Sequence, residues 1–504
     1  MGADGAAAGA NGTVEALVHA WGVWRALWPH VLAVAIVAIS VFTSVHAILT
    51  KRDTRSTIGW VGLIWFSPIV GAIAYALFGV NRIRSRALQL RLGRRAVSHR
   101  LAAAVATPAR LDAAVGRDGE GLRSLVDVVD RITRQGLLDG NRIEPLDGGD
   151  EAYPSMLAAI DGATRSIGLS SYIFDNDATG REFAAALGRA VARGVAVRVL
   201  VDGIGAHYTR PPILDALAAA GVPAREFLPT SVPVFLAYAN LRNHRKIMVV
   251  DGSLGFTGGL NIREGCRLSR APAHPVRDMH FALAGPVVTQ LLEVFVEDWA
   301  FAADERLDAD PAWHPVTAPA GTVLARGIRF GPDDDDLGRI KLVIAGALAA
   351  ARHSVRVMTP YFLPDDTICR SLDVAALRGV EVDIVIPGEN NLSLVQWAGT
   401  ALLWQVLGHG CRVWLSPPPF DHTKLMIVDG AWVMFGSGNW DERSMRLNFE
   451  FNVEAHDREL AGRLDAHVAA TIARSRRVTL DEVDGRSLPI RLRDGIARLF
   501  APYL

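Results

Sequence analysis

Two copies of one short pattern, His-x-Lys followed by Asp, are the part of the sequence best suited to chemistry. Both copies are complete, and their residues are His244, Lys246, Asp251, His422, Lys424 and Asp429. The offset between the copies is constant at 178 residues (422 − 244). The chain has only four lysines, and two of them occupy this pattern. Core packing gives no reason for such a repetition, so we interpret the pattern as functional.

Two imidazoles and two ammonium groups suit displacement at a phosphodiester. One histidine can attack phosphorus while the other, protonated, donates to the departing alkoxide. The lysines are compact positive charges for the non-bridging oxygens, whose charge must be held through the five-coordinate state. A covalent phosphohistidine divides the reaction in two, so either water or an alcohol can complete it. The spacing does not choose which histidine is the nucleophile.

Four further residues are expected to support this site: Asn261, Asn439, Asp278 and Glu450. The two asparagines recur at the same offset and offer amide donors to the phosphate oxygens. Each imidazole also needs a carboxylate to fix its tautomer and basicity. We expect Asp278 to serve the histidine of the first copy and Glu450 that of the second. The motif aspartates are expected to brace the strand and turn that carry the site.

We expect neither a metal nor another cofactor. The histidines come with lysines rather than with further ligands at zinc spacing. The three cysteines are isolated, so they provide no disulfide framework and no metal knuckle.

The repetition extends beyond the motifs and predicts a duplicated α/β domain. Residues 171–174 (Ser-Tyr-Ile-Phe) resemble residues 360–363 (Pro-Tyr-Phe-Leu), and a similar match joins residues 193–197 to 378–382. In each half a helix-period stretch precedes a short strand, a helix and an apolar β-branched run. We place the halves at residues 141–320 and 321–504, related by a pseudo-twofold axis. The two motif segments read as strands that project His and Lys to one face.

The N-terminal region predicts a membrane hairpin. Residues 26–50 and 56–81 contain no Asp, Glu, Lys or Arg, and each stretch exceeds the ~20 residues that a spanning helix needs. We therefore predict a hairpin within residues 1–85, with spans at about 28–50 and 58–80, followed by a basic juxtamembrane linker at 86–140. Eight basic residues flank the outer ends of the spans and three lie in the loop between them. The positive-inside rule then puts both ends in the cytoplasm, and the membrane is crossed more than once.

The overall composition weighs against a nucleic-acid-binding protein. There are 53 basic and 53 acidic residues, so the net charge is zero. DNA binding normally requires a basic surface, and we expect no nucleic-acid partner. The sequence does not define an oligomeric state.

The two His-x-Lys-x-x-x-x-Asp segments identify the chain as a member of the phospholipase D superfamily, and nearly its whole length resembles the bacterial cardiolipin synthases. The segments that carry this wider resemblance are residues 59–60, 78–81, 171–174, 359–362, 448–450 and 498–504. It implies an enzyme of the bacterial plasma membrane with a cytoplasmic catalytic domain. It also implies transfer of a phosphatidyl group from one phosphatidylglycerol to another, giving cardiolipin and glycerol. In that superfamily the first-half histidine is usually the nucleophile, which suggests His244 for that role and His422 for the acid.

Three alternatives remain at the level of sequence. A hydrolytic phospholipase D would use water as acceptor and release phosphatidic acid. A nuclease or other phosphodiesterase of the superfamily is disfavoured by the hairpin and the neutral charge. A membrane scaffold with a decayed site is disfavoured because both motifs are intact.

Overall fold

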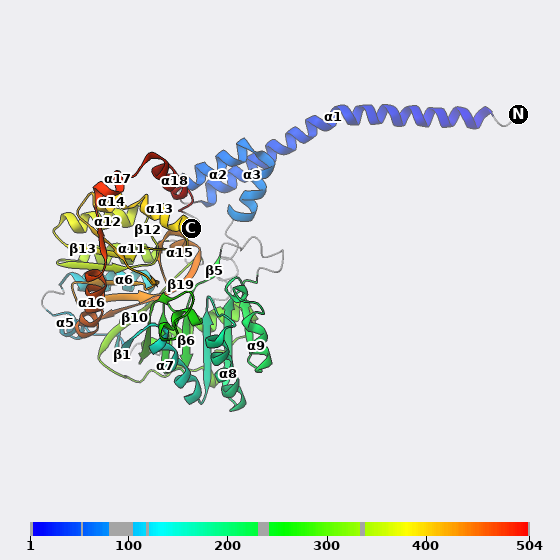
Figure 1. Ribbon diagram of the computed structural model, residues 1–504. Coiled ribbons are helices and arrows are strands. Elements are labelled where there is room, and N and C mark those ends of the chain that lie inside the picture. The colour runs from blue at the N-terminus through cyan, green and yellow to red at the C-terminus, as the bar shows by residue number, and fades with distance from the viewer. Residues whose placement is uncertain are drawn as a thin grey trace. The chain divides into compact units, whose positions relative to one another are not determined.

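The structure, a computed structural model, describes residues 4–51, 54–79, 104–116, 120–229, 241–332 and 338–501. It divides into two compact units. The first comprises Met1–Arg82 and Leu236–Asn240, and the second comprises Ile83–Phe235 and Leu241–Leu504. Each unit has its own set of elements (Figure 1). The predicted basic segment around residues 81–100 lies outside the described residues.

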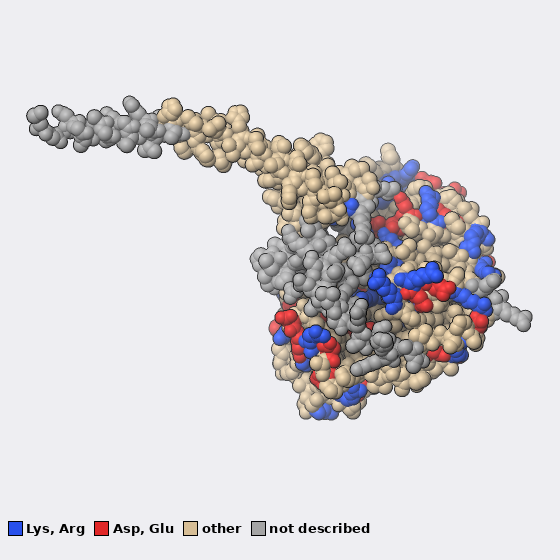
Figure 2. All heavy atoms as spheres, turned by 180° about the vertical axis from the view of Figure 1, so that it is seen from behind, with Lys and Arg blue, Asp and Glu red and all other residues tan. Residues whose placement is uncertain are grey.

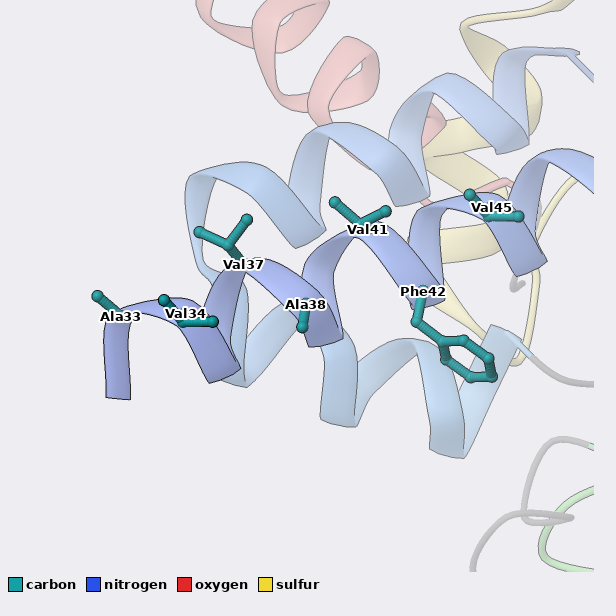
Figure 3. Close-up of a pocket in the computed structure, with 7 residues that line it drawn as sticks. All are labelled: Ala33, Val34, Val37, Ala38, Val41, Phe42 and Val45. Carbon is teal, nitrogen blue, oxygen red and sulfur yellow. The ribbon is translucent and has the colours of Figure 1, made fainter. Parts of the chain in front are cut away.

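A single long helix dominates the N-terminal unit. Helix α1 covers Asp4–Thr50, and its part from Trp21 to Thr50, 30 residues, is long and apolar enough to cross a membrane. Figure 2 shows the described part of this unit as tan almost throughout, whereas blue and red side chains mix over the other unit. Figure 3 shows a hollow on α1 that is lined by carbon side chains alone, namely Ala33, Val34, Val37, Ala38, Val41, Phe42 and Val45. A surface without polar groups suits hydrocarbon contact and has nothing with which to do chemistry.

The predicted second span is divided into shorter pieces. Helix α2 covers Thr54–Phe66, α3 covers Pro68–Ala74, and a π-helix η1 covers Tyr75–Gly79. The break falls at Ser67, whose φ of −143° and ψ of 75° are not helical. A residue before proline is disfavoured in the α region, and Pro68 cannot donate a helical hydrogen bond. Within the described residues only one helix has the length of a span, so the structure does not confirm the two-helix hairpin.

The short helices nevertheless pack on the end of α1. Ala47, Ile64 and Tyr75 form a buried cluster, and Nδ1 of His46 lies 2.8 Å from the Tyr75 hydroxyl. The chain therefore folds back along α1 after Thr50.

The larger unit is built from the duplicated α/β domain. The strands of its first half are β1 (Leu138–Asp147), β2 (Ser166–Ser171), β3 (Ala196–Asp202), β4 (Ala224–Phe227), β5 (Arg242–Asn243), β6 (Ile247–Val250), β7 (Leu254–Gly258), β8 (Val276–Arg277) and β9 (Met279–Ala284). Those of the second half are β10 (Val323–Phe330), β11 (Ser354–Met358), β12 (Phe362–Leu363), β13 (Glu381–Pro387), β14 (Arg412–Ser416), β15 (Phe420–Asp421), β16 (Leu425–Val428), β17 (Trp432–Gly436), β18 (Trp440–Asp441), β19 (Asn448–His456) and β20 (Arg476–Val478).

The helices follow the same division. The first half has α7 (Gly148–Gly162), α8 (Ala178–Ala192), α9 (Ile213–Ala219) and α10 (Val287–Ala303). The second half has α11 (Arg339–Ala350), α12 (Asp366–Leu377), α13 (Ser393–Thr400), α14 (Leu403–Leu407), α15 (Glu442–Arg446), α16 (Arg458–Ala473), α17 (Leu480–Asp484) and α18 (Leu488–Arg498).

One sheet runs through both halves and repeats its own order. Among the described residues it has 16 strands in the order β20-β14-β13-β11-β16-β17-β19-β10-β1-β9-β7-β6-β2-β3-β4, with β5 paired to β19. Outward from β1 the strands are β9, β7, β6, β2, β3 and β4, and outward from β10 they are β19, β17, β16, β11, β13 and β14. The antiparallel pair β1–β10 joins the two sets at the centre. This symmetry confirms the predicted pair of α/β halves.

Helices cover both faces of the sheet, as strand alternation requires. Ile167 and Leu169 of β2 belong to the core cluster formed with α7, α8 and α9. Gly168 between them points to the opposite face, where a Cβ atom would lie 2.5 Å from the ring of Phe295 on α10. Glycine therefore lets α10 approach the sheet closely.

Two helices precede β1 and belong to the core of the second half. Helix α5 covers Pro108–Val115 and α6 covers Glu120–Thr133. Leu111 and Val115 of α5, with Leu122, Leu125 and Val129 of α6, are buried in the same cluster as α11. The described part of residues 86–140 thus adds apolar contacts to the larger unit.

Candidate active site

Each motif segment connects two short strands that pair with different neighbours. Residues 244–246 connect β5, which pairs with β19, to β6, which pairs with β2 and β7. Residues 422–424 connect β15 to β16 in the same way. The expectation that each His and Lys lies within a strand is therefore wrong, because the chain changes its pairing partner at these residues.

The structure brings both histidines to one cleft of about 280 Å³. His244, His422, Asn261, Asn439 and Asp278 all line this cleft. Their side chains come from both halves, so one chain supplies the whole site.

The imidazoles and carboxylates are paired crosswise between the halves. Nδ1 of His244 lies 3.0 Å from Oε1 of Glu450, and Nδ1 of His422 lies 2.7 Å from Oδ2 of Asp278. The expectation that each carboxylate serves the histidine of its own half is wrong.

Strand pairing explains the exchange. Strand β5 runs parallel to the start of β19 with Asn243 opposite Phe449, which brings the next residues, His244 and Glu450, together. Strand β15 runs parallel to β8 with Asp421 opposite Arg277, one residue before the second pair. The same register in both places is a direct expression of the pseudo-twofold symmetry.

The two lysines are buried beside their histidines. Nζ of Lys246 donates to the carbonyl oxygen of His244 at 2.7 Å and lies 5.3 Å from the centre of the Tyr172 ring. Nζ of Lys424 donates to the carbonyl oxygen of His422 and lies 2.8 Å from Nδ1 of that residue. Both ammonium groups are thus held at the site by the backbone of the motif itself.

The charged side chains of the site are buried, and their pKa values follow from that. Burial lowers the pKa of Lys246 to about 7, and the charge of Lys424 adds to the decrease. Burial likewise lowers the pKa of Lys424 to about 8, against the attraction of Asp278. An anionic ligand between the lysines would reverse this decrease, because it stabilises their charged forms.

The two carboxylates differ in charge state. Burial raises the pKa of Asp278 to about 7. Burial also acts to raise the pKa of Glu450, but the charges of His244 and Lys246 outweigh it and the net change is a decrease. Glu450 is therefore ionised at neutral pH. It can then accept a hydrogen bond from a protonated Nδ1 of His244, which leaves the lone pair on Nε2 free.

The motif aspartates lie away from the cleft and brace the sheet. The carboxylate of Asp251 accepts the backbone N–H groups of Thr164, Arg165 and Ser166. Asp429 accepts those of Arg352, His353 and Ser354. Each aspartate has a φ of 52° and follows a four-residue strand that separates it from its lysine. They position the site and do not reach it.

The asparagines and two tyrosines also line the cleft. Oδ1 of Asn261 accepts the backbone N–H of Ile173 at 3.0 Å, so its amide donors are the groups that remain for a ligand. The ring centres of Tyr172 and His244 are 4.8 Å apart, and those of Tyr361 and His422 are 6.1 Å apart. Sequence reasoning noticed these tyrosines as a repeat but gave them no role.

Three arginines of the cleft were missed altogether. Arg242, Arg263 and Arg443 line it. At the offset of the repeat, Arg242 matches Phe420, Arg263 matches Asp441 and Arg443 matches Gly265, so a search for repeated residues passes over them. Their single occurrence makes the two sides of the cleft unequal.

The lowered lysine pKa values predict an early alkaline limit. For a phosphodiester substrate, kcat/KM should fall as the pH rises through about 7 to 8, because each lysine loses its charge there instead of near the ordinary 10.5. The corresponding fall in kcat should occur at higher pH, because a bound phosphate raises the pKa of both lysines. Steady-state rates across pH measure both limbs. A kcat/KM profile that stays flat up to the pKa of an ordinary lysine would contradict the placement of the lysines.

Comparisons with known proteins match most of this chain. The family model described as "Cardiolipin synthase, PLD-like domain" matches residues 156–270 and 344–472, and the model "Phospholipase_D-nuclease N-terminal" matches residues 36–79. Cardiolipin synthase A of Pseudomonas fluorescens (strain SBW25) is 31% identical over 479 residues, 94% of this chain and 99% of that protein. Cardiolipin synthase A of Pseudomonas aeruginosa (strain LESB58) is 31% identical over 94% of this chain and 96% of its own length.

A solved structure shares the fold. The crystal structure of phosphatidylserine synthase from Haemophilus influenzae Rd KW20 covers 76% of this chain and 100% of its own, with a TM-score of 0.58 at 13% identity. At that identity the likeness concerns the arrangement of the two halves alone.

Proposed function

This chain belongs to the cardiolipin synthases of the phospholipase D superfamily, and on that premise we propose that it transfers a phosphatidyl group between two molecules of phosphatidylglycerol. The products would be cardiolipin and glycerol. The observation that carries the proposal is the pair of crossed His–carboxylate contacts, His244–Glu450 and His422–Asp278, with a buried lysine at each histidine. Such a site offers a nucleophile and an acid in one cleft, with charge for a phosphate buried beside them.

In the first step His244 is the nucleophile. Its Nδ1 proton is held by ionised Glu450, so Nε2 attacks the phosphorus of a bound phosphatidylglycerol. A P–N bond forms, the bond between phosphorus and the glycerol oxygen breaks, and His422 gives its Nε2 proton to that oxygen. Lys246, Lys424 and the asparagine amides hold the non-bridging oxygens.

His422 must be protonated for this step, and the bound substrate provides the reason. In the empty site burial, with the charge of Lys424, holds the pKa of His422 well below its ordinary value. A phosphodiester anion offsets the lysine charge and favours the imidazolium.

In the second step an alcohol accepts the phosphatidyl group. The free glycerol hydroxyl of a second phosphatidylglycerol gives its proton to His422 and attacks phosphorus, whereupon the P–N bond breaks. Neutral His244 and a protonated His422 are restored. No external oxidant, reductant or energy source is required.

The proposed setting is the bacterial plasma membrane, with both ends of the hairpin and the catalytic unit on the cytoplasmic side. Helix α1 would be one span, and α2 with α3, kinked at Ser67, the other. The excess of Lys and Arg beyond the outer ends of the spans supports this orientation.

Product analysis tests the function directly. Purified full-length protein in detergent should convert phosphatidylglycerol alone into cardiolipin and free glycerol, identified by mass spectrometry. Phosphatidic acid with glycerol would mean that water is the acceptor, which is the hydrolytic alternative. A His244→Ala protein, prepared identically, controls for a contaminating activity.

A further inference from the structure

The C-terminal helix α18 has two apolar faces, of which only one is packed. Ala497 is buried in a cluster with Val395, Ala398 and Leu402, and it brings α18 against α13. Figure 1 shows the two helices side by side. Asp494 also lies on the buried side, and its carboxylate forms ion pairs with Arg486 and Arg493. This side holds α18 to the catalytic unit.

The other face is apolar and open to solvent. It is formed by side chains three or four positions apart, which a helix places along one stripe: Leu488, Leu492, Ile496 and Leu499. Leu488 is 77% exposed, Leu492 62% and Leu499 71%. Phe500, just beyond the helix, is 52% exposed. Leucine side chains so exposed in a row are unusual on a surface that meets only water.

Arginines border this stripe. Arg491 and Arg498 are exposed. They are seven residues apart, about two helical turns, and therefore lie on the same side of the stripe. An apolar stripe beside cationic side chains is the pattern of a helix that lies in the boundary between lipid head groups and acyl chains. Arginines at that depth meet phosphate groups.

The stripe is close to the mouth of the catalytic cleft. Val395 of α13, against which α18 packs, lines the cleft, as does Leu392 just before α13. Leu392 is 49% exposed and Leu394 40% exposed. Only helix α13 therefore separates the stripe from the cleft. Apolar side chains are exposed at both places, on α18 and at the start of α13.

We propose that the exposed face of α18, defined by Leu488, Leu492, Ile496 and Leu499, rests on the surface of an anionic phospholipid bilayer and holds the cleft at the head groups. The proposal rests on the proposed function, because a substrate with two acyl chains stays in the bilayer while its phosphate reaches His244. Charge complementarity between the arginines and anionic lipid favours this occupant over a second protein.

The first test locates α18 without measuring turnover. The cysteines Cys266, Cys369 and Cys411 are buried, so Leu492→Cys gives a single reactive site for a spin label in the full-length protein. In vesicles of equal parts phosphatidylcholine and phosphatidylglycerol the label should be accessible to oxygen and shielded from an aqueous nickel complex. Leu377→Cys on α12, where Leu377 is 69% exposed, is the matched site and should stay accessible to nickel.

Either of two results would overturn the docking proposal. Nickel access at residue 492 equal to that at 377 would mean that α18 faces water. Shielding from both reagents would mean that protein covers the stripe, whether the N-terminal unit or a second copy. Because location is read directly, these results are independent of whether the protein makes cardiolipin.

The second test connects the surface to catalysis. For Leu492→Gln with Ile496→Gln, the rate on phosphatidylglycerol in vesicles, divided by the rate on dihexanoyl phosphatidylglycerol below its micelle concentration, should fall about tenfold. Leu377→Gln should keep the wild-type ratio. An unchanged ratio in the α18 variant overturns the proposal, whereas absence of cardiolipin from wild-type protein on both substrates would count against the proposed function instead.

Discussion

His244→Ala is expected to abolish the covalent intermediate, whereas His422→Ala is expected to retain it when the substrate has a good leaving group. Loss of the nucleophile removes the first step entirely, so turnover should fall by about 10⁴-fold or more. Loss of the acid matters only where the departing oxygen needs a proton, and should cost about 10²- to 10⁴-fold with phosphatidylglycerol. The proposed mechanism thus gives unequal roles to two histidines that occupy equivalent positions.

Phosphatidyl-p-nitrophenol separates the two roles. Its phenolate leaves without a proton, so His422→Ala should give a burst of nitrophenol equal to the enzyme concentration, with the phosphatidyl group on His244 found by mass spectrometry. His244→Ala should give no burst. His409→Ala, a change to a half-exposed histidine outside the cleft, is the control and should behave like wild type. A burst from His244→Ala and none from His422→Ala would reverse the assignment.

The halves and the site's main residues could be predicted because they are duplicated. A pattern that occurs twice at a constant offset marks His244, Lys246 and their counterparts without any knowledge of contacts. Periodicity then predicted the α/β order, which the mirrored strands confirm. The tyrosines Tyr172 and Tyr361 are also repeated, at an offset of 189 (361 − 172), and a requirement that every repeated aromatic be given a place would have found them.

The crossed carboxylates could not be predicted in this way. His244 and Glu450 are 206 residues apart, and their contact depends on β5 pairing with β19 of the other half. This pairing and the corresponding pairing of β15 with β8 each involve only two residues. Such a segment is too short for a periodic pattern to identify. The sequence therefore indicated the carboxylates and left their partners to the fold.

The second apolar stretch is interrupted for a local reason. Its length and lack of charge predicted one continuous helix, which Pro68 divides into α2 and α3. A proline disfavours the helical conformation of the preceding residue, and Ser67 is where the helix breaks. The stripe on α18 was missed for a different reason. Four leucine and isoleucine residues at helical spacing are equally typical of a helix packed on the core and of a helix with an exposed apolar face. Only the packing of Ala497 shows which face is covered.

Glu450→Gln should slow the formation of the phosphohistidine, and Asp278→Asn should leave that step nearly intact with the nitrophenyl substrate. Each amide is close in size to the carboxylate but cannot serve only as an acceptor toward Nδ1, so its histidine is held in the wrong tautomer. In a comparable arrangement such a change costs on the order of 10⁴-fold. The burst rate in rapid-mixing experiments measures the first step alone.

This pair of variants distinguishes the crossed arrangement from the uncrossed one. If Glu450 acts on His244, the burst slows in Glu450→Gln, and if carboxylates served their own halves it would slow in Asp278→Asn instead. Glu144→Gln, at an exposed side chain, controls for the loss of a negative charge elsewhere. The ionised state of Glu450 and the raised pKa of Asp278 are consistent with the proposed roles. Glu450, which is charged at neutral pH, contacts the histidine proposed as nucleophile, and Asp278, whose pKa is about 7, contacts the histidine proposed to gain and lose a proton in each cycle.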